Sequence, residues 1–254
     1  MWLLLLLCCL SHSLRSTKNS AVRSQFFAQL SLRDDMDPYE SFNNFEKLLF
    51  SRFGQSVSEE LYGNPHQDPK NYKELMTMVN YMTRSRPIEQ VNRQGRNMLV
   101  RLFPSWLLPA FKIMFANPLP TFSAYMNCWV THYTTKWLMG NSTVSNLELK
   151  DQLDSNGIPK IAKDQLLTIE KCRFLEEAGC VRTCIHSCKL ATQSFFLEDM
   201  GIPVTLRPNF SDLSCRFEFG NHPLPIEDDE ELNVPCFEHC SWNGSRSRTS
   251  HLCQ

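Results

Sequence analysis

Three cysteines spaced four residues apart constrain this chain of 254 residues more than any other local feature. Because an α-helix turns every 3.6 residues, Cys180, Cys184 and Cys188 share one helical face, with about 6 Å between neighbours. The same spacing recurs near the C-terminus, and one further cysteine lies between the two groups. Converging thiolates form a soft-ligand site suited to an iron–sulfur cluster or Zn²⁺. The candidate metal ligands are Cys180, Cys184, Cys188, Cys215, Cys236 and Cys240.

The cysteine pattern also fits two alternatives to a metal site. Cysteine is a small and often buried side chain, so the repeat is compatible with an inert core face, and a secreted chain would permit disulfides. The spacing matches neither the paired CxxC of a zinc ribbon nor a ferredoxin run. His186 and His239 lie in the same segments and are further candidate ligands. Cys172, outside the tight spacing, and Cys128, alone in an aromatic stretch, are expected not to be ligands.

The first 33 residues differ from the rest of the chain. Met1 to Leu10 is an apolar run as long as a signal-peptide core and too short to span a bilayer, which needs about 20 apolar residues. The Ser-rich, basic stretch that follows has no acidic residue before Asp34, which is typical of a transit peptide. The two signals in series predict bipartite targeting to a plastid, with plain secretion as the alternative. No other stretch is predicted to be a transmembrane helix.

The spacing of apolar residues predicts a mainly α (α+β) fold. Residues 204–206 and 215–219 alternate and are predicted to form a short β-hairpin. Residues 141–160 are polar and glycine-containing, so a loop and a sub-boundary are expected there. The predicted helices cover residues 37–62, 72–84, 88–103, 111–138 with a break at residues 117–120, 164–177 and 181–199.

We therefore expect a helical single domain with a cysteine-rich C-terminal third that contains the hairpin. The acidic run from Glu227 to Glu231 is predicted to be a solvated loop, because no partner of opposite charge lies near it in sequence. The expected parts are a targeting segment (1–33), a helical region (34–160), a cysteine-rich domain (161–240) and a polar tail (241–254).

The helical region contains a long stretch without acidic residues, from Gln90 to Leu147, that is crowded with aromatic rings and methionines. Such a stretch is able to line a pocket for a large apolar ligand. With basic residues at its edge, it is also able to rest on an anionic lipid surface. The alternative is the core of a helical domain, which the residues alone favour. The candidate substrate-binding residues are Trp106, Phe111, Phe115 and Trp129.

Charge and motifs exclude several functions. The 26 basic and 27 acidic side chains leave no surplus for phosphate contacts, so no nucleic-acid partner is expected. The chain has no GxGxxG, GxxxxGK[ST], HExxH or GxSxG motif. Nucleotide binding, zinc proteolysis and α/β-hydrolase chemistry therefore lack their usual signatures.

The cysteine-rich segment carries enough specific residues to be compared with a family. From Lys171 it reads KCRFLEEAGCVRTCIHSCKLATQSFFLEDMGIPVTLRPNFSDLSCRFEFGNHPLP, and PCFEHC follows up to Cys240. This segment resembles the C-terminal domain of the plastid β-carotene isomerases of strigolactone biosynthesis, the Dwarf-twenty-seven family. All seven clustered cysteines fall into the family's pattern. Two residues depart from it: Ala191 stands where the plant enzymes usually have Pro, and His186 where they typically have Asn.

The resemblance implies an iron-containing carotenoid isomerase that converts all-trans-β-carotene to a 9-cis form inside plastids, with a hydrophobic carotenoid as substrate. It favours a functional role for the aromatic stretch, in substrate binding and in peripheral contact with plastid membrane lipid. The rival expectations are a non-catalytic iron–sulfur or metal-binding plastid module, and an isomerase that acts on another carotenoid. The oligomeric state does not follow from the sequence.

Overall fold

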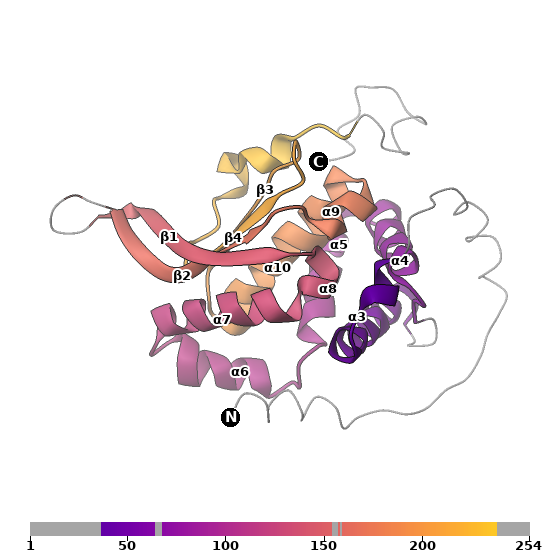
Figure 1. Cartoon of the computed structure of the whole chain (residues 1–254), viewed down its shortest axis with the longest axis horizontal. Helices are drawn as coiled ribbons and strands as arrows, with labels where there is room; N and C mark the ends of the chain where they lie inside the picture. Colours follow the sequence, from indigo (N-terminus) through magenta and orange to yellow (C-terminus); the bar gives the residue numbers. More distant parts are fainter. Residues whose placement is uncertain (1–36, 64–67, 154–156, 158, 238–254) are drawn as a thin grey trace.

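The computed structural model describes residues 37–63, 68–153, 157 and 159–237, and the predicted targeting segment and polar tail lie outside them. Within these residues the chain is mainly helical and carries a four-stranded antiparallel sheet (Figure 1). The predicted α+β class is confirmed, although the sheet is larger than the short hairpin expected from the sequence.

Three helices of the N-terminal part are found where the apolar spacing predicts them. The first begins with a capping box: the Asn43 side chain accepts a hydrogen bond from the Glu46 amide, and the Glu46 carboxylate accepts one from the Asn43 amide. A short 3-10 helix, η2 (Pro38–Ser41), precedes it. The three helices are α3 (Asn44–Tyr62), α4 (Tyr72–Ser85) and α5 (Ile88–Val100).

Between α5 and the sheet, residues 107–139 of the acid-free stretch form two helical arms joined by a sharp corner. The first arm is α6 (Leu107–Phe111), which continues as the π-helical segment η3 (Lys112–Ala116). The second is α7 (Pro120–Thr134), followed by the short α8 (Lys136–Met139). Pro118 has no amide hydrogen to donate, so the helix ends before it and the chain turns back.

The sheet has the strand order β1-β2-β4-β3, with antiparallel neighbours throughout. The predicted hairpin is confirmed as β3 (Val204–Pro208) and β4 (Cys215–Phe219). The two preceding strands, β1 (Ser142–Leu153) and β2 (Pro159–Ile169), form a longer hairpin that extends past the others (Figure 1).

The first pair of strands corrects two predictions: the loop over 141–160 and most of the helix over 164–177 are wrong. In β2 the buried residues Gln165, Leu167 and Ile169 alternate with more exposed ones, which is the period of a strand. Leu166 next to Leu167 hides that period in the sequence. β1 is an edge strand of mostly polar residues, so it shows no apolar alternation.

A long helical run carries the clustered cysteines. After α9 (Arg173–Ala178), Gly179 adopts φ 53° and ends the helix in the left-handed conformation. The run that follows confirms the helix predicted over 181–199. It consists of the π-helical η4 (Thr183–Lys189), α10 (Leu190–Ser194) and the π-helical η5 (Phe195–Met200). The C-terminal part of the described chain adds two 3-10 turns, η6 (Ile226–Asp228) and η7 (Glu230–Asn233).

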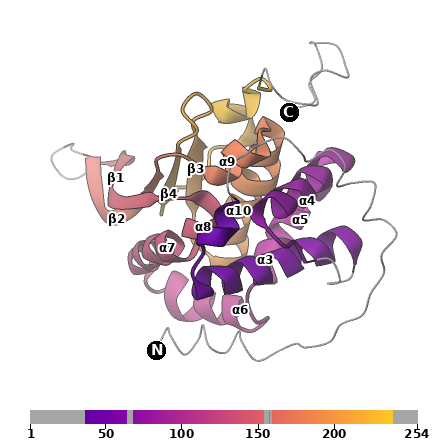
Figure 2. The ribbon, with the colours of Figure 1, turned by 45° about the vertical axis from the view of Figure 1, so that its right-hand side comes forward.

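Helices and sheet share one hydrophobic core, which includes Phe50, Trp137, Leu167 and Phe217. In Figure 2 the indigo and purple helices lie on one side and the sheet on the other, and α10 contacts both α5 and β3. Helix α5 approaches this run so closely that only glycine fits at position 95. A Cβ added at Gly95 would lie 2.6 Å from the Cβ of Ala191. Among the described residues, no helix is long and apolar enough to cross a membrane.

Candidate functional site

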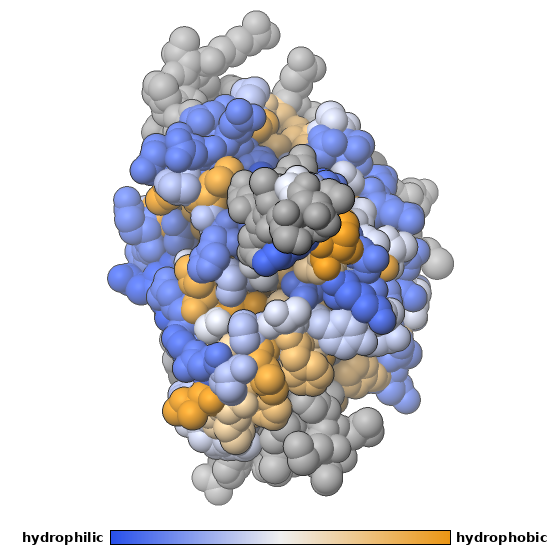
Figure 3. All heavy atoms as spheres, turned by 90° about the vertical axis from the view of Figure 1, so that its left-hand side faces the viewer, coloured by the Kyte–Doolittle hydropathy of each residue, from blue (hydrophilic) through white to orange (hydrophobic). Residues whose placement is uncertain are grey.

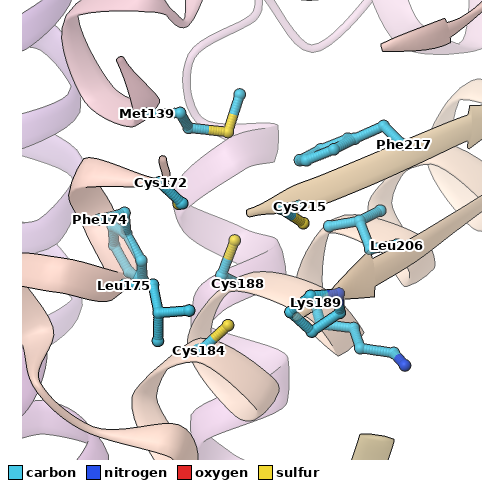
Figure 4. A pocket seen from close by; sticks show the side chains of 11 residues that line it. Met139, Cys172, Phe174, Leu175, Cys184, Cys188, Lys189, Leu206, Cys215 and Phe217 are labelled. Atoms are coloured by element: carbon cyan, nitrogen blue, oxygen red, sulfur yellow. The ribbon is translucent and has the colours of Figure 1, made fainter. Parts of the chain in front are cut away.

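A small cavity brings four cysteine side chains together where the helical run meets the sheet (Figure 4). They are Cys172, Cys184, Cys188 and Cys215, and no carboxylate or imidazole lines the cavity with them. The cavity volume is about 10 Å³, roughly the space for one water molecule. The other lining residues are Met139, Phe174, Leu175, Lys189, Leu206, Pro208 and Phe217.

Four elements position these thiols. Cys184 and Cys188 lie four residues apart on η4, and Cys215 begins β4. Cys172 precedes α9 as its N-cap residue, and its amide donates a hydrogen bond to the Leu213 carbonyl at 2.7 Å. Ile169, the last residue of β2, pairs with Cys215 in the sheet. Cys172 therefore enters the cluster because it follows a strand end that lies beside Cys215.

The cluster differs from the predicted ligand set at several positions. Cys180 is buried but does not line the cavity, because it lies in the link after Gly179, before the helical run begins. Cys236 is disulfide-bonded, which removes its thiolate from the available ligands, and Cys240 lies outside the described residues. Cys172, which the sequence spacing set aside, lines the cavity.

Two further residues named from the sequence lie away from the cavity. Cys128 is buried in α7 and does not line it. His186 is also buried and away from the cavity lining, and its Nδ1 lies 3.1 Å from Oδ1 of Asn92. Burial, with the nearby charge of Arg182, lowers the pKa of His186 to about 4, so the imidazole is neutral near pH 7. The second histidine candidate, His239, lies outside the described residues.

Burial keeps the cavity thiols protonated. It raises the pKa of Cys188 to about 12, with Cys172 adding to the effect. It also raises the pKa of Cys184 and of Cys215 well above the usual thiol value, and the neighbouring thiols raise both further. The positive charge of Lys189 lowers the pKa of both Cys184 and Cys215, but by less than burial raises it. The four sulfur atoms are thus close enough to influence each other's ionisation.

Lys189 is a buried cation beside the cluster. Its side chain is 2% exposed, and its ammonium lies 2.6 Å from Oδ1 of Asp229 and 3.0 Å from Oε2 of Glu231. Burial raises the pKa of Asp229, whereas hydrogen bonds from Asp229 and Lys189 outweigh burial and lower that of Glu231. The prediction of a solvated acidic loop is therefore wrong for these two carboxylates. Their pairing leaves no local signal in the sequence, because Lys189 lies in a distant helix.

The donor chemistry of the cluster fits a soft metal such as iron, because four thiols converge in apolar surroundings. As the side chains lie, however, no group of three or more His, Cys, Asp or Glu residues within the described part of the chain is arranged to hold a metal ion. The thiols are protonated, whereas metal ligands are thiolates. The cluster therefore supplies donors of the right kind, which would bind a metal as thiolates after losing their protons.

The four aromatic residues singled out from sequence do not share one environment. Phe111 is 5% exposed and belongs to the hydrophobic core, and Phe115 is partly buried and stacks on it with ring centroids 5.6 Å apart. Trp129 is partly buried and stacks on Tyr133 at 5.9 Å. Trp106 is half exposed at the start of α6. The stretch is thus partly core and partly surface.

Known proteins resemble the chain over most of its length. Residues 137–228 match the family described as "Beta-carotene isomerase D27-like, C-terminal". A relative named "Beta-carotene isomerase D27, chloroplastic" from Arabidopsis thaliana is 29% identical over 230 residues, which are 91% of this chain and 76% of the relative. The protein of that name from Medicago truncatula is 34% identical over 201 residues, 78% of this chain and 73% of the relative. No solved structure matches. The matched family segment contains all four cavity cysteines.

Proposed function

Because the chain belongs to the β-carotene isomerase D27 family, and is therefore an isomerase, we propose that it converts all-trans-β-carotene to a 9-cis form. The observation that supports this most strongly is the identity to two plant relatives named for β-carotene, which extends across the helical region as well as the cysteine-rich part. A polyene isomerase needs no general acid or base, which agrees with a cavity lined by thiols and apolar groups.

We propose further that Cys172, Cys184, Cys188 and Cys215 hold iron, as a single ion in a cavity of about 10 Å³ or as a cluster if the cavity walls move apart. Iron would supply reversible one-electron chemistry, which lowers the order of a polyene double bond and so eases rotation about it. The four cysteines would fix the metal as thiolates, and the Lys189 ammonium would partly compensate their negative charge. The apolar walls of Phe174, Leu206 and Phe217 would exclude water from it.

The size of the cavity limits where the polyene binds. A volume of about 10 Å³ does not admit a hydrocarbon of forty carbons, whose binding sites in proteins span several hundred Å³. The substrate must therefore meet the protein at its surface, or after the cavity walls move. Met139 belongs to the acid-free stretch and lines the cavity, so this stretch reaches from the surface to the thiols.

Co-expression in bacteria that accumulate all-trans-β-carotene tests the proposal. We expect the 9-cis to all-trans ratio, measured by chromatography, to rise severalfold over an empty-vector strain. The control strain expresses the chain with Cys188 and Cys215 both replaced by alanine. An unchanged ratio, with soluble iron-loaded protein present, would favour the non-catalytic metal module. A new isomer of another carotenoid would show that the proposed substrate is wrong and the reaction class right.

The relatives are named chloroplastic, which supports a plastid location, and we propose that residues 1–33 deliver the chain there by two signals in series. A fluorescent protein fused to Met1–Arg33 is expected to enter the plastid of an alga with a secondary plastid. A fusion that lacks Met1–Leu10 is expected to stay in the cytosol, because the first signal opens the secretory route. Microscopy of the two fusions checks this, and export of the full fusion to the medium would contradict it.

We also propose that the protein works in peripheral contact with plastid membrane lipid, because a hydrocarbon substrate partitions into lipid rather than water.

A further inference from the structure

The corner between η3 and α7 is an exposed apolar surface. Hydrophobic side chains gather in the lower part of Figure 3, where the ends of these two elements lie. Ile113 is 71% exposed, and three further apolar side chains within the next nine residues, Met114, Leu119 and Phe122, are about half exposed. Large apolar groups at this exposure on one contiguous turn indicate an interaction site rather than scattered surface residues. We name Ile113, Met114, Leu119 and Phe122 the corner patch.

The backbone presents the corner patch as a rigid edge. Pro118 and Pro120 enclose Leu119 and restrict the turn, and the Leu119 amide donates a hydrogen bond to the Phe115 carbonyl at 2.9 Å. Beneath the patch, Phe111 and Ala116 belong to the core and fix η3. Ordering such an edge against a partner costs little conformational entropy, because the chain is already fixed.

The charges around the corner patch suit a lipid headgroup layer. The acid-free stretch supplies Lys112, directly before Ile113, and no carboxylate. Of the elements packed against η3 and α7, η5 brings Glu198 and Asp199, which are both paired with Arg96, and β2 brings Asp164, whose charge acts on Cys128 of α7. The segment that forms the corner therefore offers an anionic lipid surface one cation, Lys112, with apolar side chains and no carboxylate of its own.

We propose that the corner patch is the membrane-docking surface of this protein, and that its side chains insert into the headgroup region of a bilayer that contains anionic lipid. This inference rests on the proposed contact with plastid lipid, and it identifies the residues that make it. The occupant is lipid because the segment that forms the patch contributes Lys112 and no carboxylate, which suits anionic headgroups. Docking would bring the acid-free stretch to the phase that holds the substrate.

Vesicle flotation of the full chain tests the proposal, with vesicles of phosphatidylcholine and a minority of phosphatidylglycerol. We expect Ile113→Ser together with Met114→Ser to lower binding at least about tenfold, because two apolar side chains no longer leave water. The matched control is Leu224→Ser together with Ile226→Ser, which removes two exposed apolar side chains, 41% and 72%, at and just before η6. We expect that control to bind as the unchanged chain does. The N-terminal segment is the same in all variants, so a difference between them comes from the patch.

Hydrogen exchange with and without vesicles locates the contact independently. Protection by vesicles is expected in peptides that cover 107–122, and not in those that cover 222–233. Equal flotation of both variants, or protection confined to the N-terminal segment, would overturn the proposal. Protection of 107–122 that grows with protein concentration without lipid would assign the patch to a second copy instead. Turnover of carotene in detergent separates the docking proposal from the proposed function. The double variant is expected to keep its turnover in detergent. If the unsubstituted chain is itself inactive there, that result counts against the isomerase but not against docking.

Discussion

Alanine at Cys188 or Cys215 is expected to abolish iron binding and isomerase activity together. Protein purified without oxygen should contain iron and absorb broadly in the visible, and each variant should lose both. The reason is that each substitution removes one of four converging donors, and loss of a ligand weakens metal affinity by more than the roughly 100-fold typical of outer-shell changes. Iron analysis and the absorption spectrum check this without relying on activity.

The same experiment distinguishes two sets of iron ligands: the four cysteines that line the cavity, which include Cys172, and the set predicted from sequence spacing, which includes Cys180 instead. Alanine at Cys172 is expected to behave like the two variants above, whereas alanine at Cys180 should keep iron, because Cys180 does not line the cavity. Iron uptake should also weaken as the pH falls, since each bound thiol must lose a proton. Full activity in an iron-free, colourless preparation would end the metal hypothesis, and iron lost from the Cys180 variant but kept by the Cys172 variant would restore the spacing-based set.

Methionine at Lys189 is expected to destabilise the fold by about 3–5 kcal/mol. The substitution keeps much of the side-chain volume but leaves Asp229, whose side chain is 5% exposed, as a buried carboxylate without its cation. Such a group costs more free energy than the lost attraction alone. Denaturant unfolding followed by circular dichroism measures the difference. Adding Asp229→Leu to the variant should recover part of the loss, because it removes the uncompensated charge.

The matched control is Lys171→Met, which breaks an ion pair with Glu176 whose side chains are 60% and 41% exposed. Exposed pairs contribute about 0–1 kcal/mol, so this variant should unfold almost as the unchanged chain does. Equal free energies of unfolding for the two lysine variants would show that burial of the Lys189 cluster adds no stability.

Much of the helical part could be predicted from the sequence, because its cause is local. In α4, for example, Leu75, Met76, Val79 and Met82 are all buried, and their spacing alone marks the helix. The helix predicted from residue 37 begins instead at Asn44, although the capping box at Asn43 that starts it also involves only neighbours in the chain. The comparisons confirm the family resemblance for the same reason, since it rested on residues close together in sequence.

The site was harder to predict, because its members come together through the sheet. Without β2, nothing in the sequence places Cys172 beside Cys215, and the seven-cysteine count offers no way to choose among them. The spacing also places Cys180 on the same helical face as Cys184 and Cys188. In the structure Cys180 directly follows Gly179, which ends α9 in the left-handed conformation, and it does not line the cavity. The partners of Lys189 are hidden in the same way, since 40 residues separate it from Asp229. Long-range pairing, not local propensity, decides the positions of Cys172 and of the partners of Lys189.

The raised thiol pKa values have a consequence for how the cluster withstands air. Peroxides and disulfides react with the thiolate form, and burial raises the pKa of Cys188 to about 12, so little of this thiol is ionised near neutral pH. Cys188 and its neighbours should therefore be oxidised slowly while they hold protons, even where oxygen is abundant. A newly folded chain would keep its donors chemically intact during the interval before they are used.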